Sequence, residues 1–315
     1  MNDVIYLVVP CYNEEEVLPE TVKRLTAKLN ALAESGKISP ESRALFVDDG
    51  SKDRTWELIS SYNRDYPNVC GLKLSRNQGH QNALIAGLDA ARERCDAAIS
   101  LDCDLQDDIE AIDRFIDAYH DGCDVVYGVR CSRETDTFFK RTTAQGFYKV
   151  MKVLGVDIVY NHADYRLMSR RALEALADFS EVNLFLRGMV PLVGFKSTTV
   201  EYERAERFAG ESKYPLKKML SFAFDGITSF SVKPIRMILS VGVFIMILAF
   251  ALLIYALVAK LTGSTNAGWA SIFGSIWFLG GLQLFAIGLV GEYIGKIYKE
   301  TKRRPRYFVD QLLVK

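Results

Sequence analysis

The chain has 315 residues, with 39 acidic and 39 basic side chains, so its formal net charge is zero. This balance gives no global electrostatic reason to bind nucleic acid, and we expect no nucleic-acid partner. The charge is placed unevenly, because segments 237–259 and 269–291 contain no charged residue. The six cysteines form neither a CxxC pair nor a zinc-binding spacing, so we expect reduced thiols and no structural zinc.

Short apolar runs alternate with amphipathic stretches over the first 130 residues. The apolar runs predict strands at 5–9, 44–47, 69–74, 97–101 and 125–128, and helical periodicity predicts helices at 14–32, 55–64, 82–94 and 109–120. Continuous apolar runs are typical of strands that are covered on both faces. The pattern therefore predicts an α/β fold with a doubly wound, mostly parallel sheet, in which ligands bind at the carboxyl ends of the strands.

The pattern is less regular after residue 130, where it predicts helices at 137–154 and 169–179 and an edge strand at 197–203. Segment 215–230 mixes two lysines with aliphatic and aromatic residues. This mixture favours an amphipathic helix at a membrane surface, with an ordinary surface helix as the alternative.

The two uncharged segments are each 23 residues long, and a membrane-spanning helix needs roughly 20 apolar residues. Buried core helices are the alternative, but they are usually shorter and carry a polar face. Basic residues flank the pair on the side of the long chain ends: Lys217, Lys218, Lys233 and Arg236 before it, and Lys296, Lys299, Lys302, Arg303, Arg304 and Arg306 after it. We therefore expect a multi-pass protein of the cell membrane with both termini in the cytoplasm.

Four regions follow from this pattern: a cytosolic domain at 1–213, a juxtamembrane amphipathic helix at 214–234, a two-helix transmembrane hairpin at 235–296 and a basic cytosolic tail at 297–315. The apolar run near the N-terminus is too short for a signal peptide. Glycines in the second apolar segment allow close helix contact within one chain or between chains, so a homo-oligomer stays open.

Three acidic clusters follow predicted strands: PCYNEE at 10–15, DDGS at 48–51 and DCDLQD at 102–107. Together they suit a divalent cation, Mg²⁺ or Mn²⁺, that in turn holds a diphosphate. Asp102 and Asp104 leave an extended segment on the same side and could both ligate the metal, with the amide oxygen of Gln106 as a further ligand. The alternatives are turn residues for the third cluster and a turn with a helix cap for the second. Neither GxGxxG nor GxxxxGK[ST] is present, which argues against dinucleotide cofactors and a P-loop kinase.

Seven sequence blocks carry a family resemblance: VVPCYNEEE, VDDGSKDRT, SRNQGHQ, DCDLQD, DYRLMSR, RAERFAGESKY and GEYIGKIYKETKRRPRY. On these blocks the chain resembles glycosyltransferase family 2, and within it the polyprenyl-phosphate glycosyltransferases of the bactoprenol glucosyltransferase and dolichol-phosphate mannose synthase type. The resemblance covers residues 8–307 and implies a GT-A-like head, a nucleotide-sugar donor and a polyprenyl phosphate acceptor. The last two blocks separate this group from other family members.

The resemblance also implies site residues. It assigns Pro10, Tyr12, Glu14, Asp48, Asp49 and Asp102 to the nucleotide sugar, Arg207, Ser212 and Lys213 to its diphosphate, Arg130 and Arg141 to the lipid phosphate, Asp102, Asp104 and Gln106 to the metal, and catalytic roles to Asp104 and Asp164. Arginine suits a phosphate because its planar fork matches the phosphate oxygens.

Asp164 lies where relatives place a candidate base, with His162 as a second candidate. A phosphate monoester has a second pKa near 6, however, so the acceptor is largely a dianion at neutral pH and hardly needs a base. Asp164 could instead position sugar hydroxyls or stabilise an oxocarbenium charge. We expect single-displacement, inverting transfer with UDP-glucose as the favoured donor and UDP-N-acetylglucosamine, UDP-galactose and GDP-mannose as alternatives. A processive polysaccharide synthase is one alternative, although no QxxRW block is present, and a non-catalytic membrane adaptor is another.

Overall fold

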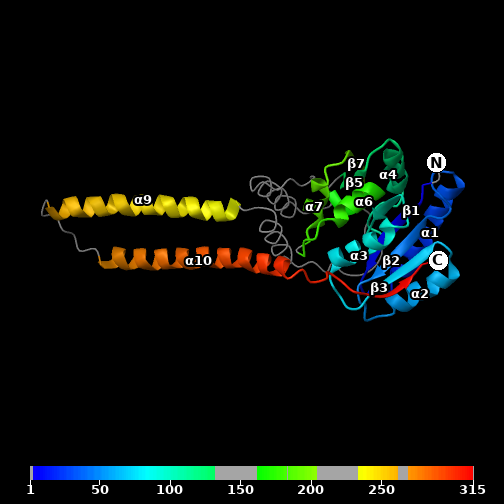
Figure 1. The fold of residues 1–315 in the computed structure, drawn as a ribbon, viewed down its shortest axis with the longest axis horizontal. Coiled ribbons are helices and arrows are strands. Elements are labelled where there is room, and N and C mark those ends of the chain that lie inside the picture. Colours follow the sequence, from blue (N-terminus) through cyan, green and yellow to red (C-terminus); the bar gives the residue numbers. More distant parts are fainter. Residues whose placement is uncertain (1–2, 132–161, 183, 204–232, 262–268, 315) are drawn as a thin grey trace.

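The computed structural model describes residues 3–131, 162–182, 184–203, 233–261 and 269–314. They form an α/β head from which two long helices project side by side (Figure 1). The helices predicted at 137–154 and 215–230 lie outside the described residues.

The head is built on one eight-stranded sheet with the strand order β7-β5-β6-β4-β1-β2-β3-β8. Its strands are β1 (Ile5–Cys11), β2 (Arg43–Asp48), β3 (Val69–Leu74), β4 (Ala97–Ser100), β5 (Val125–Arg130), β6 (His162–Ser169), β7 (Ser197–Tyr202) and β8 (Val309–Leu313). Strands β1 to β4 are parallel, whereas β6 runs antiparallel to both of its neighbours and β8 runs antiparallel to β3. The predicted doubly wound α/β fold is confirmed, and the sheet is mixed because β6 and β8 run antiparallel to their neighbours.

The order of the strands reverses direction at β1. From β1 the chain moves to β2 and β3 on one side, and it then crosses to β4 on the other side of β1. In open α/β sheets, ligands bind beyond the carboxyl ends of the strands at such a switch point. The loops that follow β1, β2 and β4 are therefore the place to look for a site.

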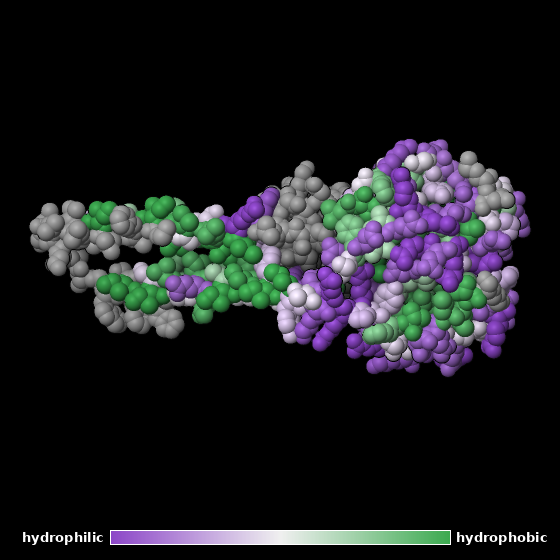
Figure 2. All heavy atoms as spheres, in the orientation of Figure 1, coloured by the Kyte–Doolittle hydropathy of each residue, from purple (hydrophilic) through white to green (hydrophobic). Residues whose placement is uncertain are grey.

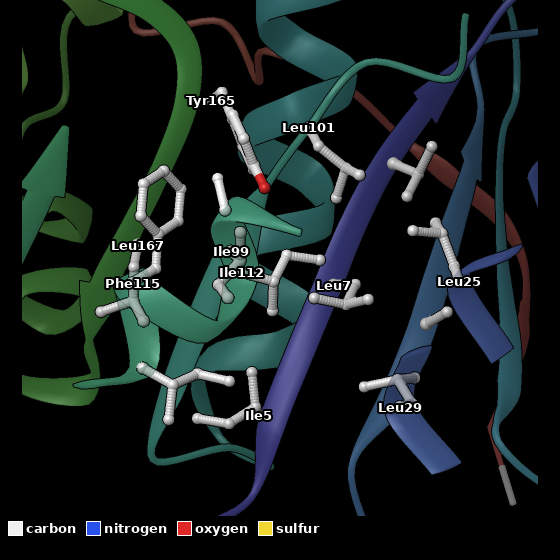
Figure 3. Packing of buried hydrophobic residues seen from close by; sticks show 14 of the residues in the cluster. Ile5, Leu7, Leu25, Leu29, Ile99, Leu101, Ile112, Phe115, Tyr165 and Leu167 are labelled. Carbon is white, nitrogen blue, oxygen red and sulfur yellow. The ribbon is translucent and has the colours of Figure 1, made fainter. Parts of the chain in front are cut away.

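Two layers of helices cover the sheet, with α1 (Leu18–Glu34), α2 (Thr55–Asp65) and α4 (Ala111–His120) on one face and α3 (His80–Arg92), α6 (Arg170–Ala177) and α7 (Leu186–Leu192) on the other. Successive residues of β1 point to opposite layers, as the pleat requires. Leu7 packs in the first layer, where Figure 3 shows it between Ile112 of α4 and Leu25 of α1, and Val8 packs in the second.

The predicted elements of the first 130 residues are confirmed, because each overlaps one of β1 to β5 or α1 to α4. The predicted strand at 197–203 corresponds to β7, which lies at an edge of the sheet, and the predicted helix at 169–179 corresponds to α6. Helix α6 is capped by Ser169, whose hydroxyl accepts a hydrogen bond from Ala172 N–H at 3.2 Å. The sequence pattern did not predict β6, α7 or β8.

The segment expected as a basic tail, 297–315, is structured. Helix α10 continues into it as far as Thr301, and β8 then pairs with β3 at the edge of the sheet. Just before β8, the N–H of Ser75 donates to the carbonyl of Phe308 at 2.9 Å. The C-terminal segment therefore completes the sheet of the head instead of trailing from the last helix.

The two projecting helices are α9 (Lys233–Leu261) and α10 (Trp269–Thr301). Figure 2 shows apolar residues over both helices and a mostly hydrophilic surface on the head. Within the part of the chain that the structure describes, one segment, Phe278–Thr301 of α10, is long and apolar enough to cross a membrane. The structure therefore supports one of the two expected spans, and α9 as a second span stays a prediction.

Candidate active site

Backbone contacts tie the loops after β1 and β2 together. The N–H of Asp49 donates to the carbonyl of Cys11 at 2.9 Å, and Asn13 N–H donates to Ser51 Oγ at 3.0 Å. Asn13 has a φ of 53°, a conformation that asparagine tolerates better than most residues, and its side-chain oxygen accepts from Lys52 N–H at 2.8 Å. The first two acidic clusters thus form one connected unit.

Asp48 and Asp49 are both buried in this unit. One oxygen of Asp48 accepts the Ser51 N–H at 3.1 Å, while its Oδ2 is buried without a hydrogen-bond partner among the described residues. The two oxygens of Asp49 accept the N–H groups of Gln78 at 2.7 Å and Gly79 at 2.9 Å. Burial raises the pKa of both carboxyls. Asp49 therefore holds the loop before α3 in place, whatever else it contacts.

That loop presents His80, the first residue of α3. Gly50 has a φ of 65°, and a Cβ there would lie 2.5 Å from the backbone nitrogen of Asn77, so the position requires glycine. Helix α3 also lies close to the sheet, since a Cβ on Gly87 would be 2.4 Å from a methyl carbon of Val8. These close approaches fix where His80 stands relative to the strand ends.

Asp102 and Asp104 follow β4 in a tight turn. Leu105 between Asp104 and Gln106 has a φ of 57°, and the Gln106 N–H donates to Asp104 Oδ1 at 3.2 Å. The Asp102 side chain is 40% exposed, and its Oδ1 lies 3.7 Å from His80 Nε2. The pKa of Asp102 is raised, mainly by burial and further by the nearby carboxylates of Asp164 and Asp104. His80 acts in the opposite direction and lowers this pKa. Negative charge is therefore concentrated at this point.

Asp164, on β6, is held by two arginines. Arg166 Nη2 lies 2.5 Å from Asp164 Oδ1, and Arg187 Nη2 lies 3.2 Å from Asp164 Oδ2. Burial alone would raise the pKa of the Asp164 carboxyl, but Arg187 and Arg166 hold it well below its usual range. A carboxylate in this state is ionised at neutral pH and accepts a proton poorly. The arrangement favours a role for Asp164 as a fixed negative charge.

Arg130 ends β5 beside a buried polar pair. Tyr202 donates its hydroxyl to Asp107 Oδ1 at 2.6 Å, and Arg130 Nε donates to the Tyr202 oxygen at 3.3 Å. Burial raises the pKa of Asp107 to about 6, and the charge of Asp102 adds to this effect. The Arg130 side chain is 25% exposed, so Tyr202 orients a guanidinium that still reaches solvent.

The remaining predicted residues divide into two sets. Pro10 pairs with β2 at the end of β1, Tyr12 follows it half-buried, and Glu14 precedes α1, where its N–H donates to Thr55 Oγ1 at 2.9 Å. Arg141, Arg207, Ser212 and Lys213 lie outside the described residues, as does the side chain of His162.

Four residues join the site to which the sequence assigned no role: His80, Arg166, Arg187, which was left undecided as a phosphate ligand, and Tyr202. His80 and Arg166 stand inside the blocks SRNQGHQ and DYRLMSR, and the spacing of Asp164 and Arg166 places them on one face of a strand. That spacing was an available signal for Arg166. Arg187 and Tyr202 carried no comparable local signal.

A divalent cation fits the donors at this edge of the sheet. Carboxylate oxygens are the ligands that Mg²⁺ and Mn²⁺ prefer, and Asp102 and Asp104 supply them in the turn that follows β4. No group of three or more His, Cys, Asp or Glu side chains with metal-binding geometry occurs among the residues that the structure describes.

The comparison with known families decides the class. Residues 6–177, which include β1 to β6 and the acidic clusters, match glycosyl transferase family 2. The chain belongs to this family. Its C-terminal helices, residues 233–297, match the GtrB C-terminal hairpin. The chain is therefore a glycosyltransferase with a family 2 head and a C-terminal hairpin.

Relatives within family 2 match over nearly the whole chain. The chain is 59% identical over 307 residues to the uncharacterized glycosyltransferase YkoT of Bacillus subtilis (strain 168), with 98% of this chain and 91% of the relative covered. It is 42% identical over 308 residues to the bactoprenol glucosyl transferase of Shigella phage SfX, with 97% and 98% covered. A solved structure, mannosyl-3-phosphoglycerate synthase from Rubrobacter xylanophilus, matches at 16% identity with a TM-score of 0.48, covering 75% of this chain and 74% of that chain.

Proposed function

We propose that this protein transfers a hexose from a nucleotide sugar, with UDP-glucose favoured, to polyprenyl phosphate at the cytoplasmic face of the membrane. The observation that carries the proposal is that Asp102 and Asp104 follow β4, whose last residue, Ser100, donates its hydroxyl to the carbonyl of Asp164 on the paired strand β6 at 2.6 Å. The full-length similarity to a bactoprenol glucosyl transferase supports the acceptor and the sugar. The product would be a polyprenyl-phosphate sugar that serves cell-envelope glycan modification.

The donor would lie across the carboxyl ends of β1, β2 and β4. In this proposal Pro10, Tyr12, Glu14, Asp48 and Asp49 line the nucleoside part, and Arg207, Ser212 and Lys213 contact the diphosphate. Asp102, Asp104 and Gln106 would hold Mg²⁺ or Mn²⁺, which supplies positive charge to the leaving diphosphate. The unpartnered Oδ2 of Asp48 is consistent with a donor group that bonds there, because a buried acceptor without a partner is costly.

Asp164 would act by charge and position and not as a base. Its carboxylate is clamped by Arg166 and Arg187, and the acceptor phosphate already carries a nucleophilic oxygen near neutral pH. The phosphate oxygen attacks the anomeric carbon from the face opposite the diphosphate, so the configuration inverts. Asp164 then orients sugar hydroxyls and stabilises the positive charge that develops at that carbon.

The acceptor would enter from the membrane side. Arg130, oriented by Tyr202, and Arg141 would hold the lipid phosphate, since arginine binds phosphate oxygens in pairs. We propose that α9 and α10 both span the membrane, with both termini cytoplasmic and the head at 1–213 joined to them by an amphipathic helix at 214–234. The glycines of α10 leave room for a homo-oligomer.

The test is incubation of membranes that contain the protein with a set of labelled nucleotide sugars. Label in an organic-extractable phospholipid, with the sugar identified by mass, supports the proposal. Label in insoluble polymer indicates a processive synthase, and absence of label with every donor would indicate a non-catalytic protein. Either of the last two results sinks the proposed function.

A further inference from the structure

The cytosolic end of α10 is bonded to a loop of the head. Both carboxylate oxygens of Glu300 accept the N–H of Val182, at 3.0 and 2.8 Å. A negative charge in the last turn of a helix opposes the helix dipole, so this position has a local cost that the charge-assisted bond to Val182 offsets. Six residues further on, the Arg306 guanidinium donates to the carbonyl of Phe179 in the same loop.

The loop that receives these bonds, residues 178–185, joins α6 to α7, and the structure describes all of it except residue 183. At its end the N–H of Leu186 donates to Gln81 Oε1 at 3.1 Å, next to His80. The following residue is Arg187, which pairs with Asp164. Arg187, which pairs with Asp164, therefore lies only five positions after Val182, which contacts α10.

A second contact joins the same end of the chain to α3. Tyr307 donates its hydroxyl to Asp89 Oδ2 at 2.7 Å, and α3 carries His80 at its first residue, 3.7 Å from Asp102. Both α3, which carries His80, and the loop before α7, the helix that carries Arg187, are thus bonded to the end of α10 or to the chain that follows it. Figure 1 shows α7 on the side of the head that faces the two long helices.

We propose that Glu300 is a positioning residue for sugar transfer. It holds the loop 178–185, the loop sets the place of Arg187, and Arg187 sets the charge at Asp164. The position of the end of α10 is then coupled to the position of Arg187 beside Asp164. Arg187 is correctly placed only when Glu300 of α10 is bonded to Val182 of the head. The catalytic part of this inference rests on the proposed function, but the coupling itself does not.

The experiment compares the wild-type full-length protein in phospholipid nanodiscs with Glu300→Ala, Glu300→Gln and a matched control, Glu292→Gln, which removes an exposed carboxylate from the same helix. Hydrogen exchange of amides in 182–188 reports the coupling, and the kcat for transfer and the KM for the donor report the site. In Glu300→Ala we expect exchange at 182–188 to rise, and kcat to fall, by about tenfold to a hundredfold, the worth of a hydrogen bond to a charged group. The donor KM stays unchanged, Glu300→Gln recovers part of both effects, and Glu292→Gln behaves as wild type.

Each result decides. Unchanged amide exchange at 182–188 in Glu300→Ala overturns the proposal, and so does raised exchange with an unchanged kcat. A fall in kcat that is accompanied by weaker donor binding and lower thermal stability also overturns it, because such a change marks a purely structural residue. If Glu300→Ala does not fold, Val182→Pro removes the donor from the other partner and carries the same expectations. If exchange responds as expected but the wild type makes no lipid product, the proposed function fails and the coupling stands.

Discussion

Asp102, which follows β4, and Asp164, on the neighbouring strand β6, are two carboxylates with contrasting surroundings. Asp102 is 40% exposed, and the carboxylates of Asp104 and Asp164 add to the effect of burial in raising its pKa. Asp164 is paired with Arg166 and Arg187, which lower its pKa. The Asp102 carboxylate is partly exposed and stands among other carboxylates, whereas the Asp164 carboxylate is bonded directly to two guanidinium groups.

This difference in surroundings predicts different roles for the two aspartates. Carboxylates that stand close together repel one another, and a bound cation stabilises them. A carboxylate that neutralises a buried guanidinium is part of the fold itself, because removing it leaves a charge uncompensated. Substitutions at the two positions should therefore separate activity from stability.

The largest effect on activity is expected at Asp104, two residues from Asp102. Asp104→Ala should lower the rate of sugar transfer by about 10²–10³-fold, since it removes an electrostatic group aimed at the departing diphosphate. The thermal unfolding temperature and membrane insertion should stay at wild-type values. Transfer is measured as labelled lipid product, and Asp65→Ala, at the exposed end of α2, is the matched control. Near-normal transfer in Asp104→Ala would refute the metal role of this residue.

Asp164→Asn should change both quantities. The substitution keeps the shape but leaves Arg166, whose side chain is 2% exposed, without its counter-charge. Breaking a buried ion pair in this way costs about 3 kcal/mol of stability, visible as a lower unfolding temperature in detergent. The transfer rate should fall as well. A stable but inactive Asp164→Asn protein would contradict the structural half of the comparison, and a fully active one would contradict the catalytic half.

The pH dependence of stability gives a smaller, graded version of the same test. The pKa of Asp164 in the folded state lies below its unfolded value of about 3.9. Its stabilisation is therefore fully present above about pH 4 and is lost only as the pH falls through the folded-state pKa. The difference in unfolding free energy between the wild type and Asp164→Asn should stay constant from about pH 7 to 5 and shrink at lower pH. A difference that shrinks already between pH 7 and 5 would mean that the arginines do not hold the carboxyl ionised.

The two carboxylates also differ in how far sequence alone reaches them. Asp102 and Asp104 follow β4, which can be recognised from a run of consecutive apolar residues. Their place beyond the carboxyl end of this strand could therefore be predicted. Asp164 lies on β6, which inserts antiparallel between β4 and β5. That pairing joins residues far apart in the chain. The sequence of β6, HADYRLMS, mixes polar, charged and apolar residues and therefore does not predict a strand.

The partners of Asp164 show the same limit. Arg166 could have been paired with it from the spacing, because residues i and i+2 share one face of a strand. Arg187 could not, since α7 and the loop before it are placed by tertiary contacts with Gln81 and Glu300. The strand β8 is a further case, because five residues form it only by adding to β3. Local periodicity thus predicted β1 to β5, β7, α1 to α4 and α6, but not β6, α7 or β8, which depend on contacts between distant parts of the chain.

Arg187→Lys should have the smallest effect and sharpens the comparison most closely. Lysine keeps the positive charge near Asp164 but loses the planar fork, whose Nε and Nη2 reach Asp164 Oδ1 and Oδ2 at 3.4 and 3.2 Å. Because the Arg187 side chain is 33% exposed, its loss should cost under about 1 kcal/mol of stability, as for a partly solvated ion pair. The transfer rate should nevertheless fall by about tenfold, because orientation and not net charge is what changes. If Arg187→Lys instead destabilises the protein as much as Asp164→Asn does, the two arginines are equivalent structural partners and the pair does not tune the site.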